Sequence, residues 1–325
     1  MKVSRTQQHM VYSFETVVVP ISLFACRLQP FRVDALSHAL IASIVFSASG
    51  LTPLIPFAVL GTVIPDADIF FPAISNRNPS LYLFTHGGIT HSMAGVFILS
   101  LVAYGIVILL AAAAIVVPGS IIAAGINGFA AIFTGALLHL TIDVAALPGI
   151  PLLAPISDRK YTLGVLPGPS LFLAAAALVL IGVVTFSFLS RSSAILLYGV
   201  VVVLYITLRA AVFIIAGVKL PGWKIPTINP LRWLVIRENT SSYMIRYYTL
   251  FRGYSDEAVY AKFRDTGTSD LAAASSFPEV RRFFFSSLIV TAERCGSVLV
   301  LTDPLREKGY LSYPVKYKQV AVKLD

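Results

Sequence analysis

Residues 92–117 read SMAGVFILSLVAYGIVILLAAAAIVV, a long run without a single charged side chain. An α-helix rises about 1.5 Å per residue, so roughly 20 apolar residues are enough to cross the hydrocarbon core of a bilayer. This run therefore predicts a membrane-spanning helix, and it decides the class of fold to expect for the rest of the chain.

The composition of the whole chain agrees with that expectation. Of the 325 residues, 57% are hydrophobic and only 13% are charged, and the mean hydropathy is +0.81. A soluble domain usually carries about 25% charged residues. We therefore expect a multi-pass protein of the cell membrane whose main partner is the lipid bilayer.

Further apolar stretches predict the remaining helices of this domain. Residues 121–140, 171–189 and 194–218 are each long enough to span a bilayer. Two shorter runs within 35–64 are separated by the turn-like sequence SGLTPLIP, and they form either a short helical hairpin or a tilted pair buried against the other helices. The expected fold is mainly α: a polytopic helical membrane domain of about six helices, the first two short, over residues 35–218.

The basic residues predict how this domain is oriented. With six helices both termini lie on the same side of the membrane, and that side carries most of the loop charges: Arg27, Arg32, Arg77, Arg159, Lys160, Lys219 and Lys224. The opposite side carries Arg191 alone. The positive-inside rule therefore predicts that the N- and C-termini are cytoplasmic.

The segment before the helices, residues 1–34, is expected to be an N-terminal extension. Its apolar part at 16–26 is short and contains Pro20, so it is a weak signal-like segment, an interfacial helix or an upstream extension, and we do not count it as a span. The two cysteines, Cys26 and Cys295, are far apart in sequence and form no CxxC pair, which argues against a disulfide framework and against thiolate metal binding.

The sequence changes in character after residue 218. The stretches YMIRYYTLF, GSVLVLTD and YPVKYKQVAVKL contain alternating patterns with many β-branched or aromatic residues, which predicts strands, and a helix is expected near 255–263. Residues 219–325 are thus expected to form a small β-rich cytoplasmic domain. The chain has a net charge of +9, much of it in this tail, which favours contact with anionic lipid; no nucleic-acid-binding motif is visible.

The polar residues of the helical domain are concentrated near the expected helix ends on one membrane face. They are histidines and aspartates: His38, Asp66, Asp68, His86, His91, His139 and Asp143. Ionisable side chains at a membrane are costly and are usually paired or functional. We therefore predict that this set binds a metal ion.

The spacing of these residues fits the prediction. His139 and Asp143 are one helical turn apart and can reach the same cation. A mixed set of imidazoles and carboxylates suits Zn²⁺, Mn²⁺ or Fe²⁺ better than Ca²⁺, and the number of candidates allows two ions. An aspartate that is not a ligand, whether Asp66, Asp68 or Asp143, is a candidate general base.

The order of five motifs adds a family resemblance. SHAL, IPDAD, HGGITHS, HLTID and PGIPLLAPISDRKYTLG follow one another as in the YdjM/YfhP-like membrane-bound metal-dependent hydrolases, which this chain resembles over about residues 35–218. The resemblance implies a divalent-metal site at the same histidines and aspartates, and a hydrolase activity. The family usually reads His-Arg-Gly where this chain has His86-Gly87-Gly88, so an arginine suited to a substrate phosphate is missing.

Taken together, these features predict a metal-dependent hydrolase that acts on a phosphoester or lipid at the cytoplasmic face. Arg159, Lys160 or Arg209 are candidates to bind the substrate in place of the missing arginine. The alternative is a non-enzymatic protein that binds or transports a metal, and a third possibility is a scaffold in which the site only serves folding. A transporter usually places its ligands near the bilayer midplane, whereas these candidates lie near one edge, which favours the hydrolase.

Overall fold

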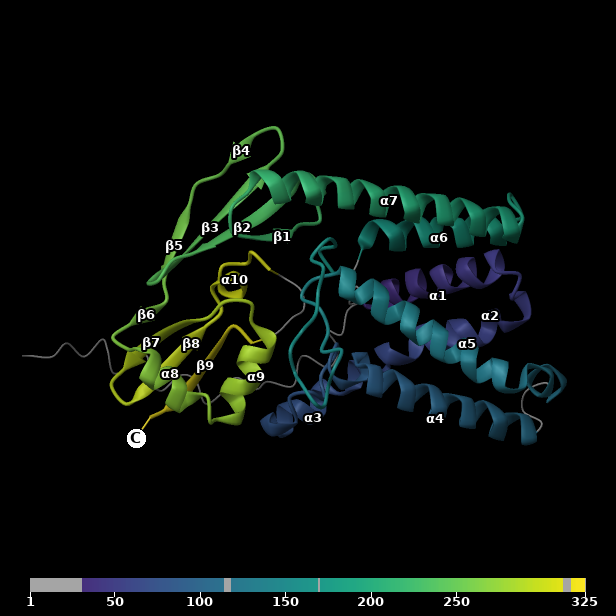
Figure 1. Ribbon diagram of the computed structural model, residues 1–325, viewed down its shortest axis with the longest axis horizontal. Coiled ribbons are helices and arrows are strands. Elements are labelled where there is room, and N and C mark those ends of the chain that lie inside the picture. Colours follow the sequence, from purple (N-terminus) through teal and green to yellow (C-terminus); the bar gives the residue numbers. More distant parts are fainter. Residues whose placement is uncertain (1–30, 114–117, 169, 312–316, 325) are drawn as a thin grey trace, which may run out of the picture.

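The structure is a computed structural model that describes residues 31–113, 118–168, 170–311 and 317–324. The predicted extension, residues 1–34, and Cys26 therefore lie outside the described residues, except for residues 31–34 at the start of the first helix. Figure 1 shows two parts, a bundle of long helices and a β-rich region packed against one end of it.

The bundle contains helices that run roughly along a common direction (Figure 1). Its α-helices are α1 Phe31–Ala48, α2 Ile55–Val63, α3 Pro72–Arg77, α4 Met93–Ala112, α5 Pro118–Ala145, α6 Leu171–Thr185 and α7 Arg191–Lys219. Short 3₁₀ segments link them: η1 Thr52–Leu54, η2 Ile64–Phe70, η3 Pro79–Leu81 and η4 Ile89–His91.

The helices confirm a membrane domain. Within the described residues, four helical stretches are long and apolar enough to cross a membrane: Thr52–Arg77, Met93–Ala112, Gly125–Ala145 and Arg191–Lys219. Two further apolar helices are shorter, Ala35–Ala48 and Phe172–Thr185. The mainly helical membrane domain is thus confirmed, while the number of six spans stays a prediction.

Glycines set the distance between α2 and α5. A Cβ atom on Gly61 would lie 1.9 Å from the carbonyl oxygen of Ile132, and one on Gly135 would lie 2.1 Å from that of Ala58. The two helix backbones therefore approach each other more closely than any larger side chain allows, which is how helices commonly pack in membranes. This contact places the end of α2 beside the last turns of α5.

The β-rich region follows α7 and contains two sheets. The first is antiparallel in the order β1-β2-β3-β4, with β5 also paired to β3; its strands are β1 Trp223–Pro226, β2 Arg232–Glu238, β3 Ser242–Thr249, β4 Gly253–Tyr254 and β5 Ala258–Ala261. The second has the order β6-β7-β8-β9, with strands β6 Phe263–Arg264, β7 Thr291–Cys295, β8 Val298–Thr302 and β9 Gln319–Lys323. The region's helices are α8 Thr268–Ala274, α9 Pro278–Ser286 and α10 Pro304–Glu307.

The β-rich C-terminal region was predicted correctly, with one error in its detail. The alternating stretches predicted as strands contain β3, β8 and β9. The helix predicted near 255–263 is wrong, because this segment contains β5, which pairs with the start of β3. Val259 and Tyr260 are β-branched and aromatic residues, and pairing with a neighbouring strand outweighs the weak helical pattern around them.

The two parts contact each other beside the loop that carries His86. Arg282 in α9 donates a hydrogen bond from Nη1 to the carbonyl oxygen of Ser75 in α3, at 2.7 Å. The ring of Phe285, at the end of the same helix, lies 5.4 Å from that of Tyr82, just after η3. The β-rich region therefore rests on the end of the bundle at which the predicted ligands lie.

Candidate metal centre

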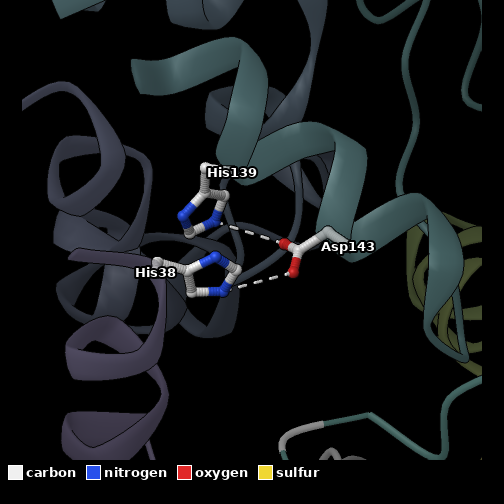
Figure 2. Close-up of side chains that lie close together, drawn as sticks. All are labelled: His38, His139 and Asp143. Carbon is white, nitrogen blue, oxygen red and sulfur yellow. Dashed lines mark ion pairs between the residues drawn. The ribbon is translucent and has the colours of Figure 1, made fainter. Parts of the chain in front are cut away.

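The structure brings together all the histidines and aspartates predicted to bind a metal. They come from four places in the chain: α1 supplies His38, η2 supplies Asp66 and Asp68, the segment through η4 supplies His86 and His91, and α5 supplies His139 and Asp143. Their ligand atoms form three overlapping groups, in each of which the atoms lie within 4.8 Å of one another. Figure 2 shows one group, with His38 and His139 both directed toward Asp143.

The end of α2 fixes the orientation of His139. The carbonyl oxygen of Thr62, in the last turn of α2, lies 2.7 Å from Nδ1 of His139. Since a carbonyl only accepts, Nδ1 is the protonated nitrogen, and Nε2 of His139 carries the lone pair.

Asp68 organises the loop opposite. It is fully buried, and its carboxylate accepts hydrogen bonds from the amide of Gly87 at 3.1 Å and from the hydroxyl of Thr90 at 2.5 Å. The same carboxylate lies 2.6 Å from Nδ1 of His86 and 3.2 Å from Nδ1 of His91. Both oxygens of Asp68 are thus engaged, and they hold Nδ1 of two histidines, as carboxylates behind metal-ligating histidines often do.

Four atoms face one another at the spacing of metal ligands. Nε2 of His91 lies 3.1 Å from Nε2 of His139, and each lies 3.3 Å from Oδ2 of Asp143. Oδ1 of Asp66 lies 3.6 Å from the first nitrogen and 3.7 Å from the second. A tetrahedral ion with nitrogen and oxygen ligands at about 2.0–2.1 Å separates those ligands by about 3.3–3.4 Å. The donor set and its spacing therefore fit Zn²⁺ or a similar ion.

His38 adds a further donor beside this group. Its ring stacks on that of His139 at 4.1 Å, and its Nε2 lies 3.7 Å from Oδ1 of Asp143 (Figure 2). Asp143 therefore directs one oxygen toward His38 and the other toward His91 and His139. A carboxylate in this position is able to bridge two ions.

The electrostatics of the site favour a bound cation. Burial lowers the pKa of His91, but its contacts with the carboxylates of Asp66 and Asp68 outweigh burial and raise that pKa to about 10. The carboxylates that retain a proton on His91 also attract a divalent ion to the same position.

A pocket opens onto the candidate metal centre. The polar part of its lining includes His38, Asp66, His86, His91 and Asp143, and the rest is largely apolar. Gly87 also lines it, with a φ of +70° that suits glycine, and a Cβ atom there would meet nothing within 4 Å.

The three basic residues predicted to bind substrate lie in different places. Lys160 lines the pocket, and its Nζ lies 4.2 Å from the ring centre of Phe285. Arg159 is exposed and lies near the ring of Tyr161. Arg209 lies outside the pocket and is buried against the β-rich region.

Sequence reasoning missed several residues that shape this site. Thr62 contributes only a backbone carbonyl, which no sequence pattern reveals. Phe285 belongs to α9 in the C-terminal region, far from the other residues in sequence.

Comparison with known proteins agrees with this description of a membrane protein. The family model described as YdjM inner membrane protein matches residues 33–216, which covers the helical bundle and every candidate metal ligand. No curated protein and no solved structure matches the chain. Because the match extends over more than half of the sequence, the chain belongs to the YdjM inner membrane protein family.

Proposed function

We propose that this protein is a membrane-bound, metal-dependent hydrolase that acts on a phosphoester or lipid at the cytoplasmic face. The observation that carries the proposal is a pair of imidazole nitrogens 3.1 Å apart, each of which lies 3.3–3.7 Å from the oxygens of two carboxylates, beside a pocket that reaches this group. The family and the paired histidines and aspartates support metal binding; the catalytic step is our inference.

The first ion would be held by Nε2 of His91 and His139 and by the carboxylates of Asp66 and Asp143. Nε2 of His38 and the other oxygen of Asp143 would together hold a second ion. Mixed imidazole and carboxylate ligands favour Zn²⁺ or Mn²⁺. When bound, such an ion supplies Lewis acidity, which acidifies water and polarises the bond to be cleaved.

The residues around this set have separate roles in the proposal. Asp68 acts as a positioning residue, because its oxygens are engaged by Gly87, Thr90 and the two loop histidines. His86 lines the pocket with its Nδ1 held by Asp68, an arrangement suited to moving a proton at the other ring nitrogen. Asp66 and Asp143 also line the pocket and remain candidate general bases.

The pocket favours a substrate with a negative charge and an apolar part. Lys160 is the basic side chain on its wall, and the apolar wall includes Ile142, Leu147, Leu166 and Phe285. A phosphoester of a lipid has both features, with the phosphate near Lys160 and the ions.

A metal transporter is the second candidate function. In that case ligands are expected near the middle of the bilayer, at broken helices. Here His139 and Asp143 lie near the end of α5 and His91 lies just before α4, whereas His38 lies about two turns inside α1. The ligands from α5 and from the segment before α4 thus lie near helix ends, which favours the hydrolase.

Bound metal decides between these candidates and a purely structural site. We expect stoichiometric Zn²⁺ or Mn²⁺ in purified protein by elemental analysis, and its loss in His91→Ala and Asp143→Ala. The next step is a screen with p-nitrophenyl phosphate, bis(p-nitrophenyl) phosphate, phosphatidic acid and phosphatidylglycerol. The absence of metal in the parent would reject both functions, whereas metal without hydrolysis that depends on the ligands would reject the enzyme.

The orientation and domain limits are part of the same proposal. The basic residues favour cytoplasmic termini, with residues 35–218 as the membrane domain and 219–325 as a cytoplasmic domain that covers the site. The contact of Arg282 with Ser75 supports such a cover.

A further inference from the structure

Two loops of the first sheet lie beside the final third of α7. Arg209 in this helix is buried, and its guanidinium donates hydrogen bonds to the carbonyl oxygens of Thr227 and Ile228, both at 2.9 Å. These carbonyls belong to the connection between β1 and β2. The β1–β2 loop, residues 227–231, is therefore fastened to α7 about ten residues before the helix ends at Lys219.

The turn between β3 and β4 lies at the same end of the sheet. The amide of Leu250 donates a hydrogen bond to the carbonyl oxygen of Leu231, at 2.9 Å. Leu231 in turn packs against a cluster formed by α7 and the sheet, in which the rings of Phe213 and Trp233 lie 5.9 Å apart. Figure 1 shows this end of the sheet beside the last turns of α7, rather than beyond them.

The length of α7 defines what surrounds these loops. Its 29 residues extend over roughly 43 Å, which matches a bilayer of about 40–45 Å with its headgroup layers. The last ten residues, about 15 Å, therefore cross one headgroup layer and the neighbouring edge of the hydrocarbon. Val218 is an apolar residue that is 85% exposed near the helix end, as expected where lipid covers the helix.

The side chains at the ends of the two loops fit that environment. Ile228 in the β1–β2 loop is 72% exposed, and Phe251 in the β3–β4 turn is 83% exposed. Two exposed arginines, Arg232 and Arg252, lie next to these loops in sequence. The apolar side chains at the loop ends suit the acyl region of a bilayer, and the arginines next to them suit the phosphates of the headgroup layer.

We propose that the β1–β2 loop and the β3–β4 turn insert into the headgroup layer of the bilayer that α7 crosses. Ile228 and Phe251 enter the outer acyl region, and Arg232 and Arg252 contact lipid phosphates. The arrangement also gives Arg209 a role in the fold: it ties the inserted loop to the helix with hydrogen bonds that water no longer supplies at this depth. This docking is independent of the proposed chemistry.

The test uses full-length protein in liposomes of phosphatidylcholine and phosphatidylglycerol. In a background with Cys26→Ser and Cys295→Ser, a fluorophore is attached at Phe251→Cys or Ile228→Cys. The matched control is Val259→Cys, which is 62% exposed and pairs with Met244 at the opposite end of β3. Fluorescence is measured with nitroxide-labelled lipid and with aqueous iodide as quenchers.

We expect lipid nitroxide to quench the labels at 228 and 251 several-fold more strongly than the label at 259, and iodide to show the reverse order. Equal quenching at all three positions would overturn the proposal. A second measurement uses the unsubstituted protein: a phospholipid with a photoreactive acyl chain should modify peptides that contain Ile228 and Phe251, but not Val259. Modification confined to helices of the bundle would also contradict it.

Discussion

Nδ1 of His139 in α5 lies 2.7 Å from the carbonyl oxygen of Thr62 in α2, directly behind the candidate metal centre. The contact joins two helices whose distance is set by Gly61 and Gly135. The packing of the membrane helices and the orientation of a metal ligand are thus parts of one feature. A change in the distance between α2 and α5 should therefore change the orientation of His139 and weaken metal binding.

Gly135→Ala tests this coupling. The added Cβ would lie 2.1 Å from the carbonyl oxygen of Ala58, so α5 has to move away from α2. Overpacking of this kind costs about 1–3 kcal/mol. We expect a lower thermal unfolding temperature and at least a tenfold loss of metal affinity, measured by thermal denaturation and by titration of metal-free protein with Zn²⁺.

Gly105→Ala is the matched control, because a Cβ atom on Gly105 in α4 would meet nothing within 4 Å. This variant should keep the parent's affinity for metal and its unfolding temperature, or unfold slightly later. If Gly135→Ala binds metal as the parent does, the orientation of His139 does not depend on the distance between the two helices.

Asp68→Asn separates positioning from ligation. The carboxylate of Asp68 holds Nδ1 of His86 and His91, and loss of its charge weakens both contacts while the proposed ligands remain. Replacing partners of this kind typically lowers metal affinity about 10- to 100-fold. We expect the variant to bind metal with unchanged stoichiometry and reduced affinity, whereas Asp143→Asn should lose bound metal.

Asp158→Asn controls for the loss of one negative charge. Asp158 is exposed, accepts a hydrogen bond from the hydroxyl of Tyr82 at 2.8 Å, and is neither a candidate ligand nor part of the pocket lining. It should bind metal as the parent does. If Asp68→Asn and Asp143→Asn lose metal equally, Asp68 is itself a ligand and the assignment of roles is wrong.

Much of the fold was predictable because a membrane imposes simple rules on sequence. Long apolar runs such as 92–117 predicted helices, and the alternating stretch 243–251 predicted the strand that the structure contains at β3. The number of spans does not follow from length alone, because the apolar stretches Ala35–Ala48 and Phe172–Thr185 are shorter than the other four. β5 was missed because strand pairing with β3 is a tertiary contact.

The members of the candidate site were predictable for a similar reason, but their roles were not. Charged groups such as Asp66 and Asp143 are rare beside apolar helices, so their identity stands out in the sequence. Which nitrogen of His139 faces the centre depends on the carbonyl of Thr62, and this contact exists only after α2 and α5 have packed. The position of Phe285 in the pocket depends likewise on how the C-terminal region docks.

Lys160→Gln tests how the pocket recognises an anion. Lys160 lines the pocket, whereas its neighbour Arg159 is exposed outside it and serves as the control. A hydrogen bond to a charged group contributes about 1.5–3 kcal/mol, which corresponds to roughly a 10- to 150-fold change in kcat/KM. For phosphatidic acid we expect a loss of this size in Lys160→Gln, unchanged metal content, and parent-like kinetics in Arg159→Gln. Equal losses in both variants would point to general surface charge instead.

Gly87→Arg tests whether a positive charge at a second position in the pocket can replace the charge of Lys160. Gly87 lines the pocket, and a Cβ atom there would meet nothing within 4 Å, so a long side chain can be accommodated. Its φ of +70° would cost an arginine about 1–2 kcal/mol of stability. In the Lys160→Gln background, we expect Gly87→Arg to raise kcat/KM for phosphatidic acid at least tenfold above that of Lys160→Gln alone. Gly87→Gln in the same background should not raise it. Equal kinetics for the arginine and glutamine variants would show that the phosphate does not approach this side of the pocket.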